Sequence, residues 1–326
     1  YITHSNAFSI INATITITPN TTSWTNKDIT GTVAYSNSIL INRKAGYGTT
    51  LEEAQKNIST NTSTKIIAPE NGYFYAEATD SMGNKVYESL QITKIDKIAP
   101  AKPEIKEIGE TSDVSILFTP KDNENGSGIG NVTTDSGKLT SSDDDYSLKI
   151  SSNGTSTITI YDKAGNSVSF KYTIQFFAKT NDQCTAFTGG WGQNYFKNAY
   201  GNIPGITYKY ENGVFAIYAL PQSGYGRLGT WYTNNSIDLS NWQYIHTVSS
   251  LDVSSTGTWN LWLDGTKVVS KTYNDGEYND GIARWVRLDY EIKPEDKSKH
   301  IIIGSDGLDT QTVRGYFAQG FLSKIE

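Results

Sequence analysis

One five-residue turn pattern occurs twice in this chain and constrains its fold more than any other feature. Asp-x-x-Gly-Asn stands at residues 80–84 and again at 162–166, each time between two runs rich in β-branched and aromatic residues. Glycine and asparagine accept a positive φ at low cost, and the aspartate can bond to its own turn, so both copies predict β-hairpins. Repetition at a spacing of 82 residues indicates two copies of one small domain.

The composition predicts an all-β protein and excludes several kinds of partner. With 326 residues the chain has room for two or three domains, and its β-branched residues are abundant. The net charge of -6 comes without a basic cluster, which argues against nucleic acid as a partner. No apolar run reaches membrane-spanning length, so we expect no membrane insertion, and the sequence opens on no signal peptide. The single Cys184 fits a reducing compartment or, as we favour, a bacterial surface or phage protein without disulfides.

Two domains are predicted before residue 178. The first covers residues 1–97, and Thr50 followed by Glu53 forms a capping-box signature that predicts a short helix near 50–58. Pro100 and Pro103 then favour an extended joint. The second domain covers residues 98–177 and contains the second hairpin.

These residues resemble bacterial immunoglobulin-like repeats, which occur in Gram-positive surface proteins and in phage tail proteins. The resemblance is carried by Thr-Asn-Lys-Asp-Ile-Thr-Gly-Thr-Val at 25–33, by the Asp-x-x-Gly-Asn hairpin and by Ile-Asp-Lys-Ile-Ala-Pro at 95–100. It covers residues 1–177, although the second copy lacks the Thr-Asn-Lys-Asp opening. The resemblance implies two tandem immunoglobulin-like β-sandwiches that act as spacer or adhesion modules, and a fold alone assigns no further role.

Residues 178–326 have a different character, with six of the seven tryptophans. Strong hairpin signals at 211–213 and 263–265, together with many short strands, predict a larger jelly-roll-like β-sandwich. In pattern and arrangement this region is similar to carbohydrate-binding and lectin-like jelly rolls. Alternation over 284–292 predicts a core face of apolar residues, with Trp285, Arg287, Asp289 and Glu291 on a solvated polar face. Over 258–263 it places Leu261 and Leu263 on one side and Trp262 on the other.

An aromatic ring left in water beside polar side chains suits sugar binding, because the CH-rich face of a pyranose stacks on the ring while its hydroxyls form hydrogen bonds. Packing inside the sandwich is the alternative role for the same rings. The candidate glycan contacts are Trp191, Tyr195, Tyr225, Arg227, Trp231, Trp262, Trp285, Arg287 and Asp289.

Signals for an enzyme or a cofactor are few. The three histidines, His246 among them, lack metal-ligand spacing, so each is expected to be a surface or hydrogen-bonded residue. Asp289 and Glu291 could supply a glycosidase's carboxylate pair. Residues 122–125 and 143–145 are rich in oxygen ligands and could hold Ca²⁺, but neither has EF-hand spacing, so both are expected to be solvated turns. We predict no catalytic residue, no metal and no cofactor.

Together these features predict a non-enzymatic adhesion or receptor-binding protein. Its immunoglobulin-like spacers would present a C-terminal domain that binds a glycan, such as a cell-wall polysaccharide or another cell-envelope polymer. The expected location is extracellular, on a bacterial cell surface or a virion tail. Two alternatives stay open: a structural component whose third domain contacts neighbouring proteins or copies of itself in a homo-oligomer, and a polysaccharide-active enzyme or its ancillary module.

Overall fold

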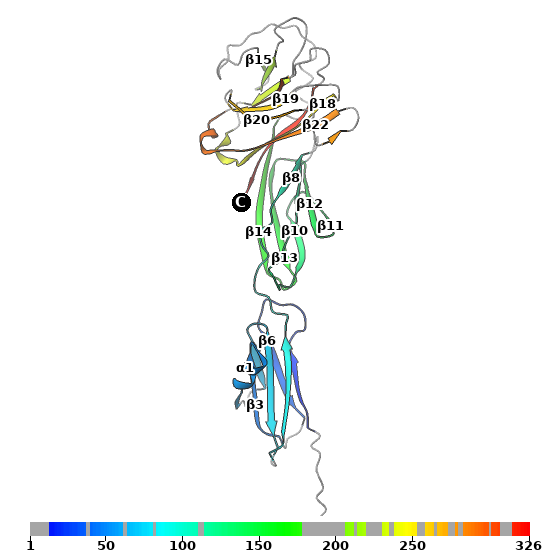
Figure 1. The fold of residues 1–326 in the computed structure, drawn as a ribbon, viewed down its shortest axis with the longest axis vertical. Helices are drawn as coiled ribbons and strands as arrows, with labels where there is room; N and C mark the ends of the chain where they lie inside the picture. Colours follow the sequence, from blue (N-terminus) through cyan, green and yellow to red (C-terminus); the bar gives the residue numbers. More distant parts are fainter. Residues whose placement is uncertain are drawn as a thin grey trace, which may run out of the picture. The chain divides into compact units, whose positions relative to one another are not determined.

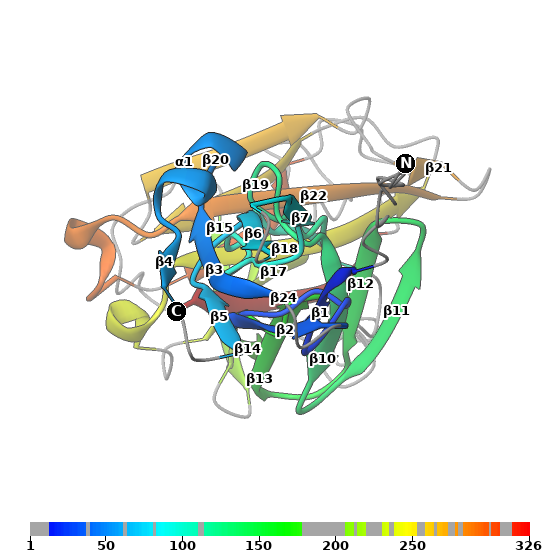
Figure 2. The same cartoon turned by 90° about the horizontal axis from the view of Figure 1, so that it is seen from below.

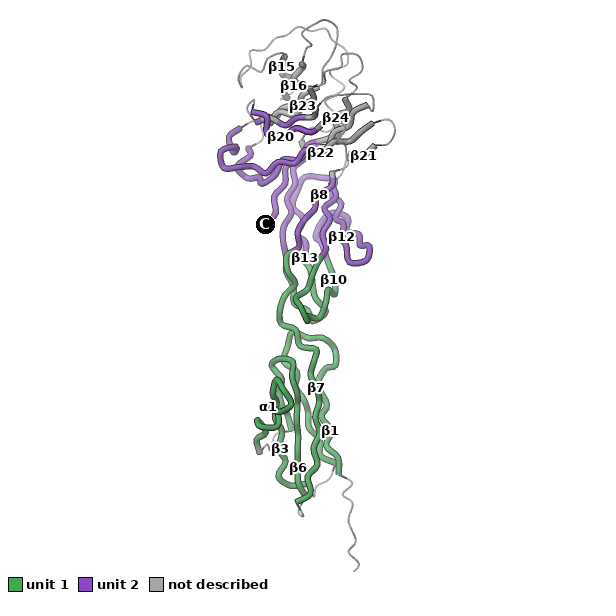
Figure 3. Tube along the Cα trace, viewed as in Figure 1, with its two compact units in different colours: residues 1–102, 120–132, 159–168 green, residues 103–119, 133–158, 169–326 purple. Residues whose placement is uncertain are grey.

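The computed structural model describes residues 13–36, 40–60, 64–80, 83–109, 114–177, 206–211, 214–219, 230–234, 238–252, 258–263, 266–272, 278–279, 283–299, 301–306 and 315–326. The chain divides into two compact units (Figure 3). Unit 1 consists of residues 1–102, 120–132 and 159–168, and unit 2 of residues 103–119, 133–158 and 169–326. The predicted boundaries of three domains stay a prediction. None of the helices that the structure describes has the length and apolar character needed to span a bilayer.

Unit 1 contains two antiparallel sheets that share a core. One has the order β1-β2-β5 (Figure 2) and the other the order β4-β3-β6-β7. Alternating residues of both sheets bury the same apolar cluster, which includes Ile29 and Val33 from the first sheet and Phe74 and Ile92 from the second. The strands are β1 (Ile15–Pro19), β2 (Ile29–Tyr35), β3 (Ile41–Gly48), β4 (Ser59–Thr60), β5 (Lys65–Ala68), β6 (Gly72–Thr79) and β7 (Lys85–Ile92).

The predicted short helix is confirmed as α1 (Leu51–Lys56). Thr50 Oγ1 accepts a hydrogen bond from the backbone N–H of Glu53 at 3.2 Å, as a capping residue should. The Glu53 carboxylate turns back to the N–H of Thr49 at 3.0 Å, one residue earlier than in the standard capping box.

Both predicted hairpin turns are confirmed, and they use the same bonds. In the first, Asp80 Oδ1 accepts from the Asn84 N–H at 2.7 Å, and Gly83 has a φ of 86°. In the second, Asp162 Oδ1 accepts from the Asn166 N–H at 2.8 Å, and Gly165 has a φ of 93°. The second turn joins β13 (Gly154–Asp162) to β14 (Ser167–Phe177).

Unit 2 is built around three antiparallel sheets, with the orders β11-β12-β9-β8, β10-β13-β14-β24-β18-β22-β21 and β15-β16-β17-β23-β19-β20 (Figure 1). β10 and β13 have residues in both units, as does β14. The remaining strands are β8 (Lys106–Gly109), β9 (Val114–Phe118), β10 (Ile129–Thr134), β11 (Lys138–Ser142), β12 (Asp145–Ile150), β15 (Ile206–Glu211), β16 (Val214–Ala219), β17 (Thr230–Asn234), β18 (Tyr244–Asp252), β19 (Thr258–Leu263), β20 (Thr266–Thr272), β21 (Tyr278–Asn279), β22 (Ala283–Glu291), β23 (Ile301–Asp306) and β24 (Gly315–Ile325). Two short 3₁₀ helices, η2 (Leu239–Asn241) and η4 (Pro294–Asp296), complete the described elements.

The predicted all-β class is therefore confirmed, while the arrangement as two immunoglobulin-like sandwiches and a jelly roll stays a prediction. The two hairpin signals beyond residue 178 are also confirmed. Glu211 pairs with Val214 across the β15–β16 turn, and Leu263 pairs with Thr266 across the β19–β20 turn.

The C-terminal strand β24 occupies the middle of the seven-stranded sheet. It pairs with β14 on one side, where Phe176 faces Phe321, and with β18 on the other, where His246 faces the same Phe321. Residues from distant parts of the chain therefore share one face of this sheet, and the side chains described next lie on that face.

Candidate functional site

The structure describes the side chains of only two of the nine candidate contacts. Trp191, Tyr195, Tyr225 and Arg227 lie outside the described residues. For three tryptophans only the backbone is described: Trp231 lies on β17, Trp262 on β19 and Trp285 on β22. Arg287 and Asp289 on β22 are described in full, and the structure brings them together.

Strand register puts Trp285 into a row of aromatic positions. It pairs with Tyr278 of β21 on one side and with Ser250 of β18 on the other. Ser250 in turn pairs with Tyr316 of β24. Directly paired residues of an antiparallel sheet share a face, so three aromatic positions line up across four adjacent strands. Alternation along β22 places Arg287 and Asp289 on this same face.

Trp231 and Trp262 belong to the other large sheet of unit 2. Trp231 shares a face with Thr233, which pairs with Ile302, and Ile302 pairs with Trp262. The register therefore places both tryptophans on one face of the six-stranded sheet. Leu261 and Leu263 are fully buried, as expected of the core side, but Asn260 on the opposite side of the strand is fully buried as well, so the strand does not alternate between buried and exposed residues there.

The expectation that Arg287 lies on a solvated face is wrong, because it is only 8% exposed. Its Nε donates to Asp289 Oδ1 at 2.7 Å, one terminal nitrogen donates to the backbone oxygen of Glu107, and the other lies 3.4 Å from Glu107 Oε2. Glu107 belongs to β8 of a different sheet. Its approach covers this part of the face and replaces solvent as the partner of the guanidinium.

His246 lies at the centre of the same network and is 2% exposed, so the expectation of a hydrogen-bonded residue is confirmed. Its Nδ1 is 2.7 Å from Asp289 Oδ1, and its Nε2 is 2.6 Å from Glu107 Oε2. A carboxylate offers only acceptors, so both ring nitrogens must donate, and the imidazolium is the form that satisfies both contacts. The ring also stacks on Phe321 at a centroid distance of 4.5 Å.

Further hydroxyl donors complete the network on Glu107. Tyr172 donates to Glu107 Oε1 at 2.7 Å and Ser323 donates to the same oxygen at 2.8 Å. Glu107, Tyr172 and Ser323 were not identified from the sequence. Each sits in an ordinary alternating strand. The pairing of β14 with β24 brings Tyr172 and Ser323 together, and Glu107 reaches them from β8 of another sheet.

The network shifts the pKa of each of its acids and bases. Burial alone raises the pKa of Glu107, but the hydrogen bond and charge of His246, with the Tyr172 and Ser323 hydroxyls, outweigh it and lower the pKa overall. Burial lowers the pKa of His246, and the contacts with Asp289 and Glu107 raise it above the usual value. For Asp289, burial is again outweighed, here by His246 and Arg287, and the pKa is lowered.

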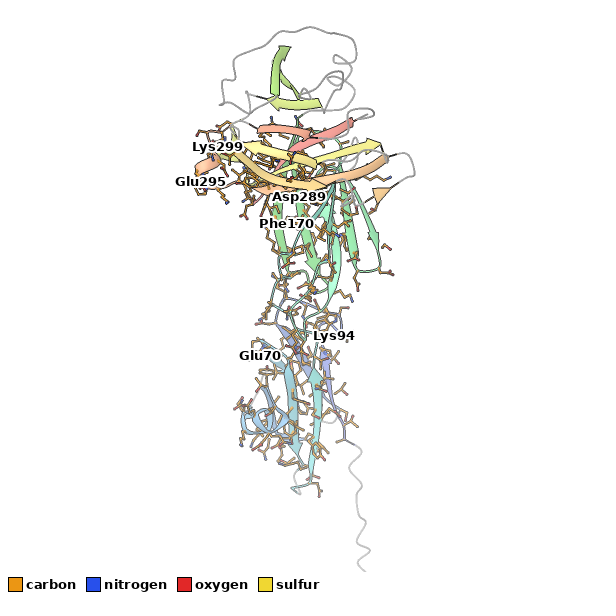
Figure 4. The ribbon with its side chains drawn as sticks, turned by 45° about the horizontal axis from the view of Figure 1, so that its top comes forward. Glu70, Lys94, Phe170, Asp289, Glu295 and Lys299 are labelled. Carbon is orange, nitrogen blue, oxygen red and sulfur yellow. The ribbon has the colours of Figure 1, made fainter. Side chains whose placement is uncertain are left out.

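Asp289 is the part of this network that reaches solvent, since 47% of its side chain is exposed (Figure 4). Its contacts with Arg287 and His246 both fall on Oδ1. The carboxylate is therefore held ionised and rigid, as a hydrogen-bond acceptor at the surface. A lowered pKa makes it a poor general acid, because the acid of a glycosidase needs a raised one.

The two oxygen-rich turns differ from each other. Asp143, Asp144 and Asp145 are exposed, as expected of a solvated turn, and Asp145 accepts from Thr119. In residues 122–125, Glu124 and Asn125 are exposed as expected of a solvated turn, whereas Asp122 and Asn123 are partly buried and each has one fully buried side-chain oxygen. Within the described part of the chain, one group of three metal-ligand side chains stands close together, and it contains Asp122 with Asp96 and Asp162.

Comparisons with known proteins do not assign a family. No family model matches the chain, and no curated protein matches it. Solved structures do match, at low similarity. A carbohydrate-binding module of the β-sandwich superfamily, described as promiscuous in specificity, is 9% identical, with coverage of 96% of this chain and 97% of that one, at a TM-score of 0.24.

Two further structures match at lower TM-scores. A carbohydrate-binding module specific for non-crystalline cellulose is 14% identical over 36% of this chain and 76% of its own, with a TM-score of 0.19. Dimeric latent PorU from Porphyromonas gingivalis is 12% identical over 93% of this chain and 33% of its own, with a TM-score of 0.16. Because all three TM-scores lie well below 0.5, these similarities carry no functional assignment.

Proposed function

We propose that this chain is a non-enzymatic glycan-binding protein, and that the aromatic row at Tyr278, Trp285 and Tyr316 forms its binding face. The proposed setting is extracellular, on a bacterial cell surface or a virion tail, with the immunoglobulin-like region as a spacer. The observation that carries the proposal is the register of β21, β22, β18 and β24, which aligns these positions on the face of β22 that also carries Asp289, four residues further along the strand.

The chemistry of the row fits a sugar chain. Aromatic faces stack on the CH groups of a pyranose, and a fixed carboxylate accepts hydrogen bonds from its hydroxyls. Asp289 supplies such a carboxylate, half exposed and oriented by His246 and Arg287. Four adjacent strands span roughly 14 Å at the usual strand spacing, so the row favours an oligosaccharide or polysaccharide over a single sugar.

The test is a glycan array followed by a polysaccharide pull-down with the full chain. Changing Trp285→Ala or Tyr316→Ala should weaken binding by about tenfold or more, as expected for aromatic residues at the centre of an interface. Tyr87→Ala is the matched control, because Tyr87 is an aromatic residue on unit 1 that is 68% exposed. That variant should bind like the wild type.

The outcomes separate the alternatives. Binding that is unchanged in both row variants would refute the proposed face, and binding lost only in Tyr87→Ala would place it on unit 1. Absence of any binding, together with a molecular mass that rises with concentration in light scattering, would instead support an assembly role.

A further inference from the structure

Three aspartates from separate segments of unit 1 converge on one point. Asp96 follows β7, Asp122 lies in the turn before β10, and Asp162 ends β13. One carboxylate oxygen of each lies within 4.8 Å of the others. Oxygens bound to Ca²⁺ at 2.3–2.6 Å stand up to about 5 Å apart when they face each other across the ion. The three carboxylates are therefore spaced as calcium ligands are.

Backbone amides hold each carboxylate in place. Asp96 Oδ2 accepts from the Ser127 N–H at 2.7 Å, and Asp122 Oδ2 accepts from the Gly128 N–H at 2.6 Å. Asp162 is fixed by Asn166 through both of its oxygens. A carboxylate oxygen with one such bond keeps a lone pair that a cation can take. The ligand atoms are thus pre-oriented.

The charges of the three carboxylates are not balanced by protein cations. Asp96 is 5% exposed and Asp162 is 4% exposed. Among the described residues, no lysine or arginine forms an ion pair with Asp96, Asp122 or Asp162. Buried carboxylates are normally paired or bound to a metal, and these three have no such direct partner among the described residues. The Lys163 ammonium lies nearby, since a Cβ atom on Gly128 would stand 3.4 Å from its Nζ, but it forms no ion pair with the group.

The same turn has two side-chain oxygens that are buried and accept no hydrogen bond from the described residues, although the other polar atom of each side chain has one. Asp122 Oδ1 and Asn123 Oδ1 each expose less than 1 Å² and have no hydrogen-bond partner. Buried acceptors in native proteins are nearly always satisfied, by protein, water or an ion. An aspartate and an asparagine oxygen are both ligands that calcium uses.

Gly126 in this turn leaves room for the side chains of Asp122 and Asn123. A Cβ atom on Gly126 would lie 2.6 Å from Asp122 Oδ2 and 2.7 Å from Asn123 Oδ1, so both side chains fold against the space that glycine leaves open. Asn125 with a φ of 62° and Gly128 with a φ of 80° make the backbone turn sharply around them.

We propose that Asp96, Asp122 and Asp162, with the side-chain oxygen of Asn123, form a calcium site in unit 1. The donors are all oxygens, which selects a hard cation and disfavours zinc. Four protein oxygens leave positions for water or backbone carbonyls in the coordination sphere of six to eight ligands. By joining three segments, the ion ties the residues after β7 to the turns that flank β10 and β14.

The experiment is calorimetric titration of the full, chelator-treated chain with CaCl₂, alongside thermal unfolding with and without calcium. We expect a single site with a dissociation constant in the range of about 10⁻⁵ to 10⁻³ M, and weaker binding of Mg²⁺. Saturating calcium should raise the unfolding temperature of unit 1 by roughly 5 °C. No heat of binding up to about 10 mM calcium, well above the range of known modules, would overturn the proposal.

Two aspartates in equivalent turns give a matched pair of variants. Asp80 makes the same two bonds to Asn84 that Asp162 makes to Asn166, and Asp80 belongs to no acidic group of three in the described residues. Asp162→Asn should weaken calcium binding by about tenfold or more, since affinity follows the charge count of the ligands. Asp80→Asn should leave it unchanged.

A further variant guards against a folding defect. Asp122→Asn keeps an acceptor for the Gly128 N–H and removes only the charge, so it should fold and still bind calcium about tenfold more weakly. Wild-type affinity in both Asp122→Asn and Asp162→Asn would refute the site. Equal loss in Asp80→Asn would also refute it, because the effect would then belong to the hairpin turns in general.

Discussion

Unit 1 and unit 2 each bury a group of carboxylates, and they balance the charge in opposite ways. In unit 2, Glu107 and Asp289 face His246 and Arg287, so two negative charges meet two positive ones. In unit 1, the described hydrogen bonds to Asp96, Asp122 and Asp162 come from backbone and amide N–H groups, and no described lysine or arginine forms an ion pair with them, although the Lys163 ammonium lies near Gly128. The first group is complete within the protein, while the second needs a cation from outside.

The two groups differ in the sign of their charge interactions. In unit 1 the three carboxylates have oxygens within 4.8 Å of one another, so their charges repel. In unit 2 the same Coulomb law is attractive, which offsets the cost of burying the ions. A buried acidic group therefore indicates a ligand only where the protein supplies no counter-charge.

The largest expected effect comes from breaking the balance in unit 2. Glu107→Ala leaves His246 and Arg287 buried without their shared partner, which should cost about 3–5 kcal/mol of unfolding free energy. Urea denaturation followed by tryptophan fluorescence reports mainly on unit 2, because six of the seven tryptophans lie beyond residue 178.

Glu104→Ala is the control for this measurement. Glu104 lies three residues earlier and is exposed, so its loss should change the unfolding free energy by less than about 0.5 kcal/mol. Similar effects in both variants would show that the network contributes no specific stability.

A smaller effect should follow from pH, which changes charges without removing side chains. The raised pKa of His246 contributes stability below pH 6.5 that is lost as the pH rises through the folded pKa. The lowered pKa values of Glu107 and Asp289 contribute stability above about pH 4.5 that is lost as the pH falls through their folded values. Unit 2 should therefore be most stable between about pH 4.5 and 6.5.

Urea denaturation across pH 3–9 (about the range in which these groups titrate) measures this profile. His246→Gln should remove the decline on the alkaline side. It should weaken the decline on the acidic side without abolishing it, because Tyr172 and Ser323 still lower the pKa of Glu107 and Arg287 that of Asp289. An alkaline decline that persists in that variant would mean that another group is responsible.

The smallest effect is expected from one hydroxyl of the network. Tyr172→Phe removes a donor to Glu107 Oε1, but Ser323 still donates to that oxygen, so the cost should be about 1 kcal/mol. Tyr146→Phe is the control, since the Tyr146 hydroxyl has no hydrogen bond among the described residues. If Tyr172→Phe lowered the unfolding free energy more than Glu107→Ala does, Glu107 would not be the central residue of the network.

Local patterns in the sequence predicted local structure well. The Thr50 and Glu53 spacing predicted helix α1, and the repeated turn motif predicted two hairpins with the same hydrogen bonds. The expected core positions Leu261 and Leu263 of β19 are buried, although Asn260 on the other side of the strand is buried too. Each of these features depends on residues within a few positions of each other, so one sequence contains the whole signal.

Long-range partners were not predictable in the same way. The alternation of residues on β22 predicts that Arg287 is exposed to solvent. In the structure it is buried, because Glu107 of β8 contacts its guanidinium. Likewise Asp122 reads as part of a polar loop until Asp96 and Asp162 are brought beside it. Alternation gives the face on which a residue lies, but it does not give what covers that face.

The central position of β24 has a consequence for biosynthesis. Because β24 lies between β14 and β18, the seven-stranded sheet has a gap until residues 315–325 have left the ribosome. Until then β14 exposes an edge with unpaired amides and carbonyls to the cytosol or to a chaperone. A chain terminated before residue 315 would therefore keep the unpaired edge of β14, which could pair with strands of other molecules.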